Sequence, residues 1–273
     1  MLRNEIEKKK RKLEKILQKA GKILIAYSGG VDSTFLLKVA VDCLGKDNVA
    51  AFIEKSEFDA PSEINFAKKF ATSLGVKVFC LKLNKLTDKQ LSNNPPDRCF
   101  YCKKELFSQM ADIARKYDYN AIADGSNVDD KFDYRPGNKA KLLFQVISPL
   151  QMANLTKADI RMLSKEMGLP TWNKPQMACL ASRIPYGEKI TEERLKRILK
   201  AEELLGKLGF HIVRVRDYGD LCRIEVSDDD FEKIIQFRRE ITKQLKEFGY
   251  IYITVDLEGY HTGSMNRTLP SKK

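Results

Sequence analysis

The feature that most constrains this chain is a glycine-rich turn between a short apolar strand and an apolar helix. An apolar run at residues 23–27 predicts a buried strand, and residues 34–41 predict a buried helix. The turn between them consists of Ser28, Gly29, Gly30, Val31, Asp32 and Ser33. Two glycines let the backbone approach a phosphate closely, and a helix N-terminus favours an anion. The turn therefore predicts a phosphate-binding loop at the start of an α/β domain.

The acidic residue in this turn predicts a metal ion. Asp32 on its own would repel a phosphate, so its position is consistent with a bound Mg²⁺. Ser28 and Ser33 add hydroxyl donors. The chain lacks the G-x-x-x-x-G-K-[ST] pattern, which disfavours Walker-type γ-phosphate chemistry. An ordinary glycine-rich turn is the alternative, and the order Ser-Gly-Gly-x-Asp-Ser after a strand is much more specific.

Strands and helices alternate through most of the chain, which predicts an α/β fold. Further strands are predicted at residues 49–53, 76–81, 121–124 and 142–147, with helices at residues 61–74 and 103–117. Another helix begins at Thr156, where Asp159 completes a pattern like a capping box, and ends at Gly168. The alternation predicts a parallel sheet, and near-continuous apolar strands predict helices on both of its faces.

The length of 273 residues favours two domains. We expect a basic helix at residues 1–22, a nucleotide-binding domain at 23–168, a connecting loop at 169–190 and a smaller α/β domain at 191–273. Within the smaller domain, helices are predicted at residues 191–208 and 228–248, and strands at 210–216, 222–226 and 250–256.

Half of the net charge of +12 lies in the first 22 residues, which contain nine Lys or Arg against three Glu. Ile6, Leu13 and Leu17 give this helix an apolar stripe with a charged back. A solvated basic face is the simpler interpretation, and contact with nucleic acid or another anion is the alternative. No RNA-binding module signature accompanies it. No apolar run approaches the ~18 residues of a membrane span, and no secretory signal is present, so we expect a cytoplasmic protein without a membrane partner.

Six cysteines are present, and a disulfide framework is not expected in a cytoplasmic chain of this size. Cys43, Cys80 and Cys222 have apolar neighbours and are predicted to lie in the core. Cys99 and Cys102 form a C-x-x-C, which suits half a zinc site, a redox pair or a cluster anchor. A zinc ribbon is not expected, because there is no second C-x-x-C and both histidines fall in the other predicted domain.

Cys179 lies in the connecting loop between Lys174 and Arg183. Nearby cations increase the reactive thiolate fraction of a cysteine. Cys179 is therefore a candidate nucleophile, with a generic loop cysteine as the alternative.

The turn at residues 28–33 resembles the PP-loop of the ATP pyrophosphatase superfamily. This superfamily includes NAD and GMP synthetases, argininosuccinate synthetase and tRNA thiolases. The resemblance implies that residues 23–168 form a PP-loop domain in which ATP is split between its α and β phosphates. The substrate is then adenylated and pyrophosphate leaves. The residues assigned to ATP by this resemblance are Ser28, Gly29, Gly30, Asp32 and Ser33.

Further segments resemble the LarE family of sulfur transferases, from Ile23 to Asn266. They are residues 94–103, 124–130, 133–137, 148–150, 178–187, 213–216, 256–260 and 263–266. Members of this family help to build the nickel-pincer nucleotide cofactor of lactate racemase and related enzymes. The resemblance implies that each carboxylate of a pyridinium-3,5-biscarboxylate mononucleotide is activated by ATP with Mg²⁺ and converted to a thiocarboxylate.

The resemblance implies two routes for the sulfur. In one branch of the family a single cysteine, matching Cys179, gives up its own sulfur and ends as dehydroalanine. In another branch this cysteine joins a C-x-x-C, and three thiolates hold a 4Fe–4S cluster whose open iron can carry an extra sulfide. With Cys99, Cys102 and Cys179 all present, the resemblance implies the cluster branch. The sacrificial route and a redox role for the C-x-x-C stay open.

Basic and polar residues complete the predicted site. Arg214 and Arg216 alternate along a predicted strand and so face one side, where guanidinium groups suit phosphate or carboxylate. Two solvated strand residues are the alternative, and the resemblance favours substrate binding, to which we also assign Arg183. Glu225 is a candidate metal ligand or partner of these arginines. Asn127 follows a predicted strand at the end where α/β ligands gather, and is assigned to ATP.

Two other functions use the same features. A tRNA thiolase would share the PP-loop, but the surplus charge is concentrated at the ends of the chain rather than in the catalytic body. A nucleotide-sensing module without activity does not account for the intact PP-loop together with Cys179. The leading helix is a candidate for assembly into a homo-oligomer, and the sulfide donor is left open.

Overall fold

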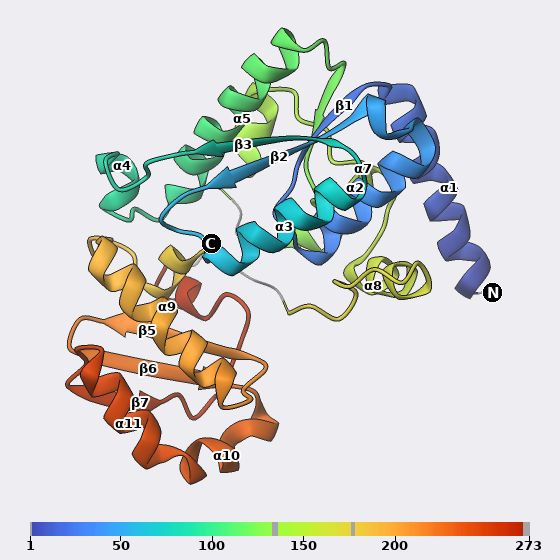
Figure 1. The fold of residues 1–273 in the computed structure, drawn as a ribbon. Helices are drawn as coiled ribbons and strands as arrows, with labels where there is room; N and C mark the ends of the chain where they lie inside the picture. The colour runs from blue at the N-terminus through green and yellow to red at the C-terminus, as the bar shows by residue number, and fades with distance from the viewer. Residues whose placement is uncertain (1, 133–135, 176–177, 270–273) are drawn as a thin grey trace. The chain divides into compact units, whose positions relative to one another are not determined.

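The computed structural model describes residues 2–132, 136–175 and 178–269. Two compact units divide the chain (Figure 1). The first contains Met1–Leu83 and Cys99–Met177, and the second contains Asn84–Arg98 and Ala178–Lys273. Residues 133–135, which belong to one of the segments that resemble the LarE family, lie outside the described residues, as do residues 176–177.

The first unit is built on a parallel sheet, as predicted, and this sheet has four strands. Its strands are β1 (Ile23–Ala26), β2 (Val49–Lys55), β3 (Lys77–Lys82) and β4 (Ala121–Ala123), in the order β3-β2-β1-β4. Ile25 of β1 lies opposite Ala51 on one side and Ala123 on the other. The strand order therefore changes direction between β1 and β4, and ligands of open α/β sheets bind outside the carboxyl ends of the strands at such a point.

Helices cover both faces of this sheet, which confirms the predicted arrangement (Figure 1). They are α1 (Leu2–Ala20), α2 (Val31–Leu44), α3 (Pro61–Ser73), α5 (Arg98–Lys116), α6 (Asn138–Leu143), α7 (Pro149–Met152) and α8 (Lys157–Glu166). The face that contains Ile23 and Ile25 packs on α1, α2, α3 and α8, and the face that contains Leu24 packs on α5. The strands are buried on both sides because successive side chains point to opposite faces.

The leading helix α1 has the apolar stripe that the sequence predicts. Leu13 and Leu17 are fully buried in the core, and most of the basic side chains lie on the exposed side. Lys9 joins α1 to α8 through an ion pair with Asp159, with 2.9 Å between Nζ and Oδ2. Over the described ranges, none of the helices combines the length and apolar character that crossing a membrane requires.

The predicted strand at residues 142–147 is wrong. Helix α6 covers the first part of this run, and Leu142 and Leu143 are 82% and 60% exposed. Ile147 alone joins the sheet, through an isolated bridge to Ala123. A short apolar run suits a helix segment as well as a strand, so the pattern by itself could not separate the two.

The three cysteines that are predicted to lie in the core differ in their exposure to solvent. Cys222 is buried, Cys43 is half-buried, and Cys80 is exposed. The prediction for Cys80 is wrong because its strand β3 forms the edge of the sheet. An edge strand has a neighbour on one side only, and this one alternates between half-buried and exposed side chains.

The second unit is a small α/β structure, as predicted. Its sheet consists of β5 (Val213–Tyr218), β6 (Leu221–Val226) and β7 (Tyr252–Val255), and its helices are α4 (Lys89–Ser92), α9 (Glu192–Lys207), α10 (Phe231–Gln236) and α11 (Arg238–Glu247). Strand β6 pairs antiparallel with β5 and parallel with β7. The helix predicted as continuous at residues 228–248 is interrupted at Phe237, whose backbone leaves the helical region at ψ 6°.

Candidate functional site

The phosphate loop lies between the carboxyl end of β1 and the first turn of α2. Gly30 is the N-cap of α2, and because it has no side chain it makes no capping hydrogen bond to the amides of the first helical turn. These amides can therefore donate to another acceptor. The hydroxyls of Ser28 and Ser33 lie 3.1 Å apart, and the amide of Gly30 points to the Ser28 hydroxyl at 3.4 Å. This arrangement of donors at a helix N-terminus suits a phosphate.

Gly29 makes this loop compact. Its φ of 73° lies in the left-handed region, and a Cβ at this position would lie 3.0 Å from Cβ of Ala67 and 3.3 Å from Cδ1 of Phe66. Both neighbours belong to α3. The absence of a side chain at residue 29 therefore lets the loop lie close against α3.

Gly29→Ala should destabilise the protein by about 2 kcal/mol or more, because left-handed strain of about 1 kcal/mol adds to the collision with α3. Chemical unfolding measures the change. Gly168→Ala is the matched control, since Gly168 has a φ of 65° with open space around its Cβ position. A loss no larger than that of the control would mean that α3 gives way and that the close approach is not required.

Asp32 is in the first turn of α2 and forms an ion pair with Lys157, the first residue of α8. Its Oδ2 accepts the Lys157 hydrogen bond, whereas its buried Oδ1 has no hydrogen-bond partner among the described residues. Burial raises the pKa of the Asp32 carboxyl above its ordinary value, against the opposing attraction of Lys157. A buried carboxylate oxygen without a partner is suited to bind Mg²⁺, which often takes one carboxylate together with phosphate oxygens.

Asn127 follows β4 and lies beside Asp32, where it favours the charged form of that carboxyl. The side chain is 1% exposed, and its Oδ1 accepts the amide of Asp129 at 2.9 Å. Within the part of the chain that the structure describes, this side chain interacts with the Asp32 carboxyl, but its Nδ2 makes no hydrogen bond of ordinary geometry. An unsatisfied buried donor is costly, so Asn127 is well placed to donate to a ligand oxygen.

Lys174 contacts the phosphate loop from another direction. Its Nζ donates to the carbonyl of Gly29 at 3.2 Å, lies 2.5 Å from Oε2 of Glu63 and stands 4.4 Å above the ring of Phe66. In the sequence, Lys174 stands out only as a neighbour of Cys179. Neither Lys157 nor Lys174 was predicted at the loop, because the contacts join residues more than a hundred positions apart.

A buried acid fixes the loop that carries Asn127. Asp124, at the end of β4, accepts hydrogen bonds from the hydroxyls of Ser126 at 2.7 Å and Ser148 at 2.6 Å and pairs with Lys141 at 2.9 Å. Burial alone would raise the pKa of Asp124, but Lys141 and Lys103 outweigh it and hold that pKa below its ordinary value. The network therefore contains a charged carboxylate that ties β4 to the residues that follow it.

The C-x-x-C occupies the first turn of α5 in the first unit. Cys99 is exposed and Cys102 half-buried, and residues three apart on a helix share a face. Gly137 packs on this turn, since a Cβ there would lie 3.2 Å from the carbonyl of Cys99. Cys179 belongs to the second unit. Neither unit, over its described residues, contains a group of three or more His, Cys, Asp or Glu that could hold a metal ion.

The Cys179 loop is fixed by a buried arginine. Cys179 is half-buried and precedes the 3-10 turn Leu180–Arg183. Its carbonyl accepts the Ser182 hydroxyl at 2.8 Å and Nη1 of Arg183 at 3.2 Å, and Nη1 also donates to the carbonyl of Ala178 at 2.7 Å. Glu202 of α9, which sequence analysis did not predict, holds the other edge of this guanidinium at 2.9 and 3.0 Å. Arg183 thus positions the cysteine loop, and its assignment to the substrate stays a prediction.

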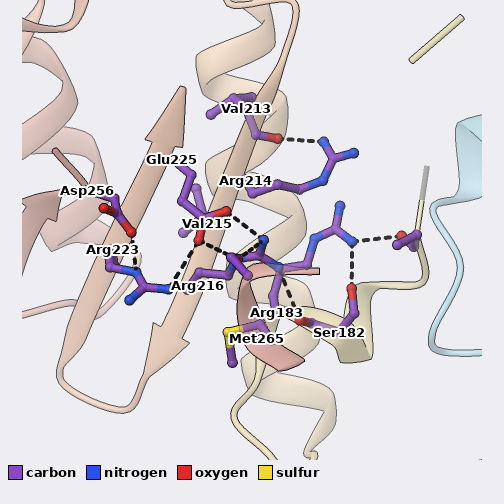
Figure 2. Close-up of polar contacts among 12 residues, drawn as sticks. Ser182, Arg183, Val213, Arg214, Val215, Arg216, Arg223, Glu225, Asp256 and Met265 are labelled. Carbon is purple, nitrogen blue, oxygen red and sulfur yellow. Dashed lines mark hydrogen bonds and ion pairs between the residues drawn. The ribbon is translucent and has the colours of Figure 1, made fainter. Parts of the chain in front are cut away.

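Arg214 and Arg216 share strand β5 and lie with Arg183 in one cluster (Figure 2). Arg216 forms a two-point ion pair with Glu225 of β6, at 2.9 and 2.5 Å, and donates to the carbonyl of Ser182 at 3.2 Å. Glu225 is therefore a partner of the arginines, one of its two predicted roles, and a role as metal ligand stays a prediction.

Arg214 lies 5% exposed, with its guanidinium 5.1 Å from the ring centre of Tyr260. Burial and the nearby charge of Arg183 lower its pKa. Both effects penalise the cation, and a bound anion would relieve them. The cluster is accordingly suited to a phosphate or carboxylate.

The residues before the C-x-x-C pack on the residues after Cys179 within the second unit. The side-chain amide of Asn94 donates to the carbonyl of Pro185 at 2.7 Å, and the amide of Gly187 donates to the carbonyl of Asn94 at 2.8 Å. Nη1 of Arg98 donates to the carbonyl of Ala181 at 3.2 Å. These contacts attach Asn84–Arg98 to the second unit.

Comparisons with known proteins show which proteins this chain is similar to. The model of the NAD synthase family matches residues 5–108. A pyridinium-3,5-bisthiocarboxylic acid mononucleotide synthase of Lactiplantibacillus plantarum is 39% identical over 96% of this chain and 95% of that protein. An uncharacterized protein of Synechocystis sp. is 40% identical over 94% of this chain and 98% of that protein. A tRNA-specific 2-thiouridylase of Desulforamulus reducens is 25% identical over 57% of this chain and 53% of that protein.

The match to the Lactiplantibacillus synthase includes nearly all of both chains, from the PP-loop domain to the arginine cluster. A similarity of this extent is shared by members of one family of enzymes. The chain therefore belongs to the LarE family of sulfur transferases, which use a PP-loop domain related to that of NAD synthase.

Proposed function

We propose that this chain converts the two carboxylates of pyridinium-3,5-biscarboxylate mononucleotide to thiocarboxylates at the expense of ATP. The observation that carries the proposal is the 39% identity with a synthase whose name gives the bisthiocarboxylic acid mononucleotide as its product. The phosphate loop with its buried Asp32 supports the ATP-dependent half of the reaction.

The adenylation step uses the first unit. The loop at Ser28 and Ser33 and the N-terminus of α2 would bind the phosphates of ATP, and Nδ2 of Asn127 would donate to a phosphate oxygen. Oδ1 of Asp32 would hold Mg²⁺, which neutralises phosphate charge when it is bound. A carboxylate oxygen of the substrate then attacks the α-phosphorus, the bond from that phosphorus to the bridging oxygen breaks, and pyrophosphate leaves with the electron pair.

The acyl-adenylate that results is open to a sulfur nucleophile. Sulfur attacks the acyl carbon, the bond between that carbon and the AMP oxygen breaks, and AMP leaves. We assign the placement of Cys179 to Arg183, which holds the carbonyls on both sides of it. Arg214 and Arg216 are proposed to bind the phosphate of the substrate mononucleotide, with Arg216 kept charged and oriented by Glu225.

For the sulfur source, we propose a 4Fe–4S cluster held by Cys99, Cys102 and Cys179. Thiolates are the usual ligands of such a cluster, and with three of them one iron is left open, which would supply a site able to carry the transferable sulfur. Support comes from Arg98, which precedes Cys99 in the chain and bonds to Ala181 in the loop after Cys179. We also propose that the reaction takes place in the cytoplasm, where thiols such as those of Cys99, Cys102 and Cys179 are kept reduced. The sacrificial use of Cys179 is the alternative route.

The proposal predicts that pyrophosphate release from ATP depends on the biscarboxylate mononucleotide and not on tRNA. Without the mononucleotide, the rate should fall by about a hundredfold, because adenylation needs an attacking carboxylate. The measurement compares initial rates with the mononucleotide, with bulk tRNA and with neither.

The tRNA arm tests the second candidate, a tRNA thiolase, which the 25% identical 2-thiouridylase favours. Stimulation by tRNA alone would replace the proposed substrate with an RNA. Equal rates in all three arms would mean that neither substrate is adenylated.

A further inference from the structure

We propose that Lys157 is a resident cation that neutralises Asp32 until Mg²⁺ displaces it, and that Lys157 then binds the pyrophosphate leaving group. This inference rests on the proposed function for its second part only. It concerns how the charge of Asp32 is balanced before the metal and the nucleotide bind.

The contacts of Lys157 hold its backbone in place and leave its ammonium group paired with Asp32, the predicted metal ligand. Lys157 begins α8, and its amide donates to Oδ2 of Asp129 at 2.8 Å. The preceding Thr156 forms a capping box with Asp159. The backbone is therefore held from two sides, whereas Nζ ends a flexible four-carbon stem whose ion pair is with Asp32.

The charges around Asp32 explain why a cation is needed there. Its carboxyl is mostly buried, with the side chain 20% exposed, and Asp130 adds a second negative charge nearby. A buried carboxylate without a partner is strongly destabilising. Lys157 supplies a compensating charge through Oδ2 and makes no hydrogen bond to Oδ1.

A metal bound at Oδ1 of Asp32 would weaken the ion pair between Asp32 and Lys157. Two cations on one carboxylate repel each other, and a divalent ion would attract the carboxylate more strongly than a monovalent ammonium group at the same distance. Lys157 then loses most of its attraction to Asp32, while phosphates at the start of α2 become the nearest anions. Once the bond to the α-phosphorus breaks, pyrophosphate has gained negative charge, so a cation placed there favours its departure.

Lys174, the other lysine at the loop, is not suited to this role. Its ammonium group already has a carboxylate of its own, Glu63 at 2.5 Å, and a carbonyl, that of Gly29 at 3.2 Å. Neither of these is the predicted metal ligand, so metal binding does not release it. Lys157 alone of these two shares its carboxylate with the metal.

The first test measures binding of Mn²⁺ alone to the nucleotide-free full chain by electron paramagnetic resonance. Lys157→Met should bind Mn²⁺ about tenfold more tightly than the wild type, because the competing cation is gone. Lys157→Gln, which keeps a hydrogen-bond donor without the charge, should behave likewise and serves if the methionine variant does not fold. Lys9→Met is the matched control, since it removes a lysine–aspartate pair from the same helix α8, and its affinity should equal that of the wild type.

The second test measures binding of inorganic pyrophosphate with saturating Mg²⁺ by calorimetry. Lys157→Met should weaken it about tenfold, and Lys157→Arg should restore most of the affinity. A Mn²⁺ affinity in the neutral variants no higher than in the wild type, or no binding at all, would overturn the displacement. Unchanged pyrophosphate affinity would overturn the second role. Neither test needs ATP turnover, so a wild type that fails to adenylate the mononucleotide refutes the proposed function separately.

Discussion

Asp32→Asn should lower pyrophosphate release from ATP by at least about a hundredfold, the loss typical when a preorganised charge is removed from a transition state. Asparagine keeps the shape of the side chain but supplies one neutral oxygen where Mg²⁺ needs a carboxylate. It also removes the carboxylate that pairs with Lys157. The negative charge of Asp32 is then missing from the loop both with and without bound ATP and Mg²⁺. Initial rates at saturating ATP, Mg²⁺ and biscarboxylate mononucleotide provide the measurement.

Asp42→Asn is the control for this variant. Asp42 lies on the same helix α2 and pairs with Lys38 four residues earlier, so its replacement also removes a lysine–aspartate pair. It is 46% exposed and has no part in the phosphate loop, so the rate should stay at the wild-type value. If Asp32→Asn retained that rate while the protein stayed folded, the phosphates of ATP would have to bind elsewhere, and the PP-loop assignment would fail.

The parts of the site that the sequence predicts well are those set by neighbours in the chain. The phosphate loop depends on a strand, two glycines and a helix within a short stretch, so its position follows from local pattern. The capping box of Thr156 and Asp159 is confirmed for the same reason. Near-continuous apolar runs likewise predict the strands β1 and β2, which are buried on both faces.

The parts that could not be predicted depend on tertiary contacts. Lys157 meets Asp32 and Arg183 meets Glu202 only after the helices have packed, and no local pattern marks a lysine or glutamate for such a partner. The segment Asn84–Arg98 joins the second unit through backbone hydrogen bonds such as that of Ile190 to Ser92, at 2.7 Å. Backbone groups are alike in every residue, so a sequence cannot show which of them will pair.

Cys179→Ser should abolish formation of the thiocarboxylate, with a loss of about a thousandfold or more, while pyrophosphate release persists. A serine hydroxyl neither binds iron as a thiolate does nor provides sulfur. The carbonyl of residue 179 and its bonds to Ser182 and Arg183 do not depend on the side chain, so the loop should keep its conformation. Mass spectrometry of the product and a pyrophosphate assay on the same sample separate the two steps.

The cluster is tested by the iron content of protein reconstituted under anaerobic conditions. The wild type should contain about four irons per chain, and serine at Cys99, Cys102 or Cys179 should remove most of them. Cys80→Ser is the matched control, because Cys80 is an exposed thiol on the edge strand β3 and its loss should leave the iron content unchanged. Equal iron in all four variants would show that the metal binds adventitiously.

The same variants separate the two sulfur routes. If a cluster carries the sulfur, all three serine variants lose the thiocarboxylate product together, because each thiolate holds the same group. If Cys179 gives up its own sulfur, the variants at Cys99 and Cys102 still complete one turnover, and intact Cys179 loses the elements of H₂S. Mass measurement of the wild-type chain after a single turnover decides between them, since an unchanged mass is compatible only with sulfur that comes from outside the chain.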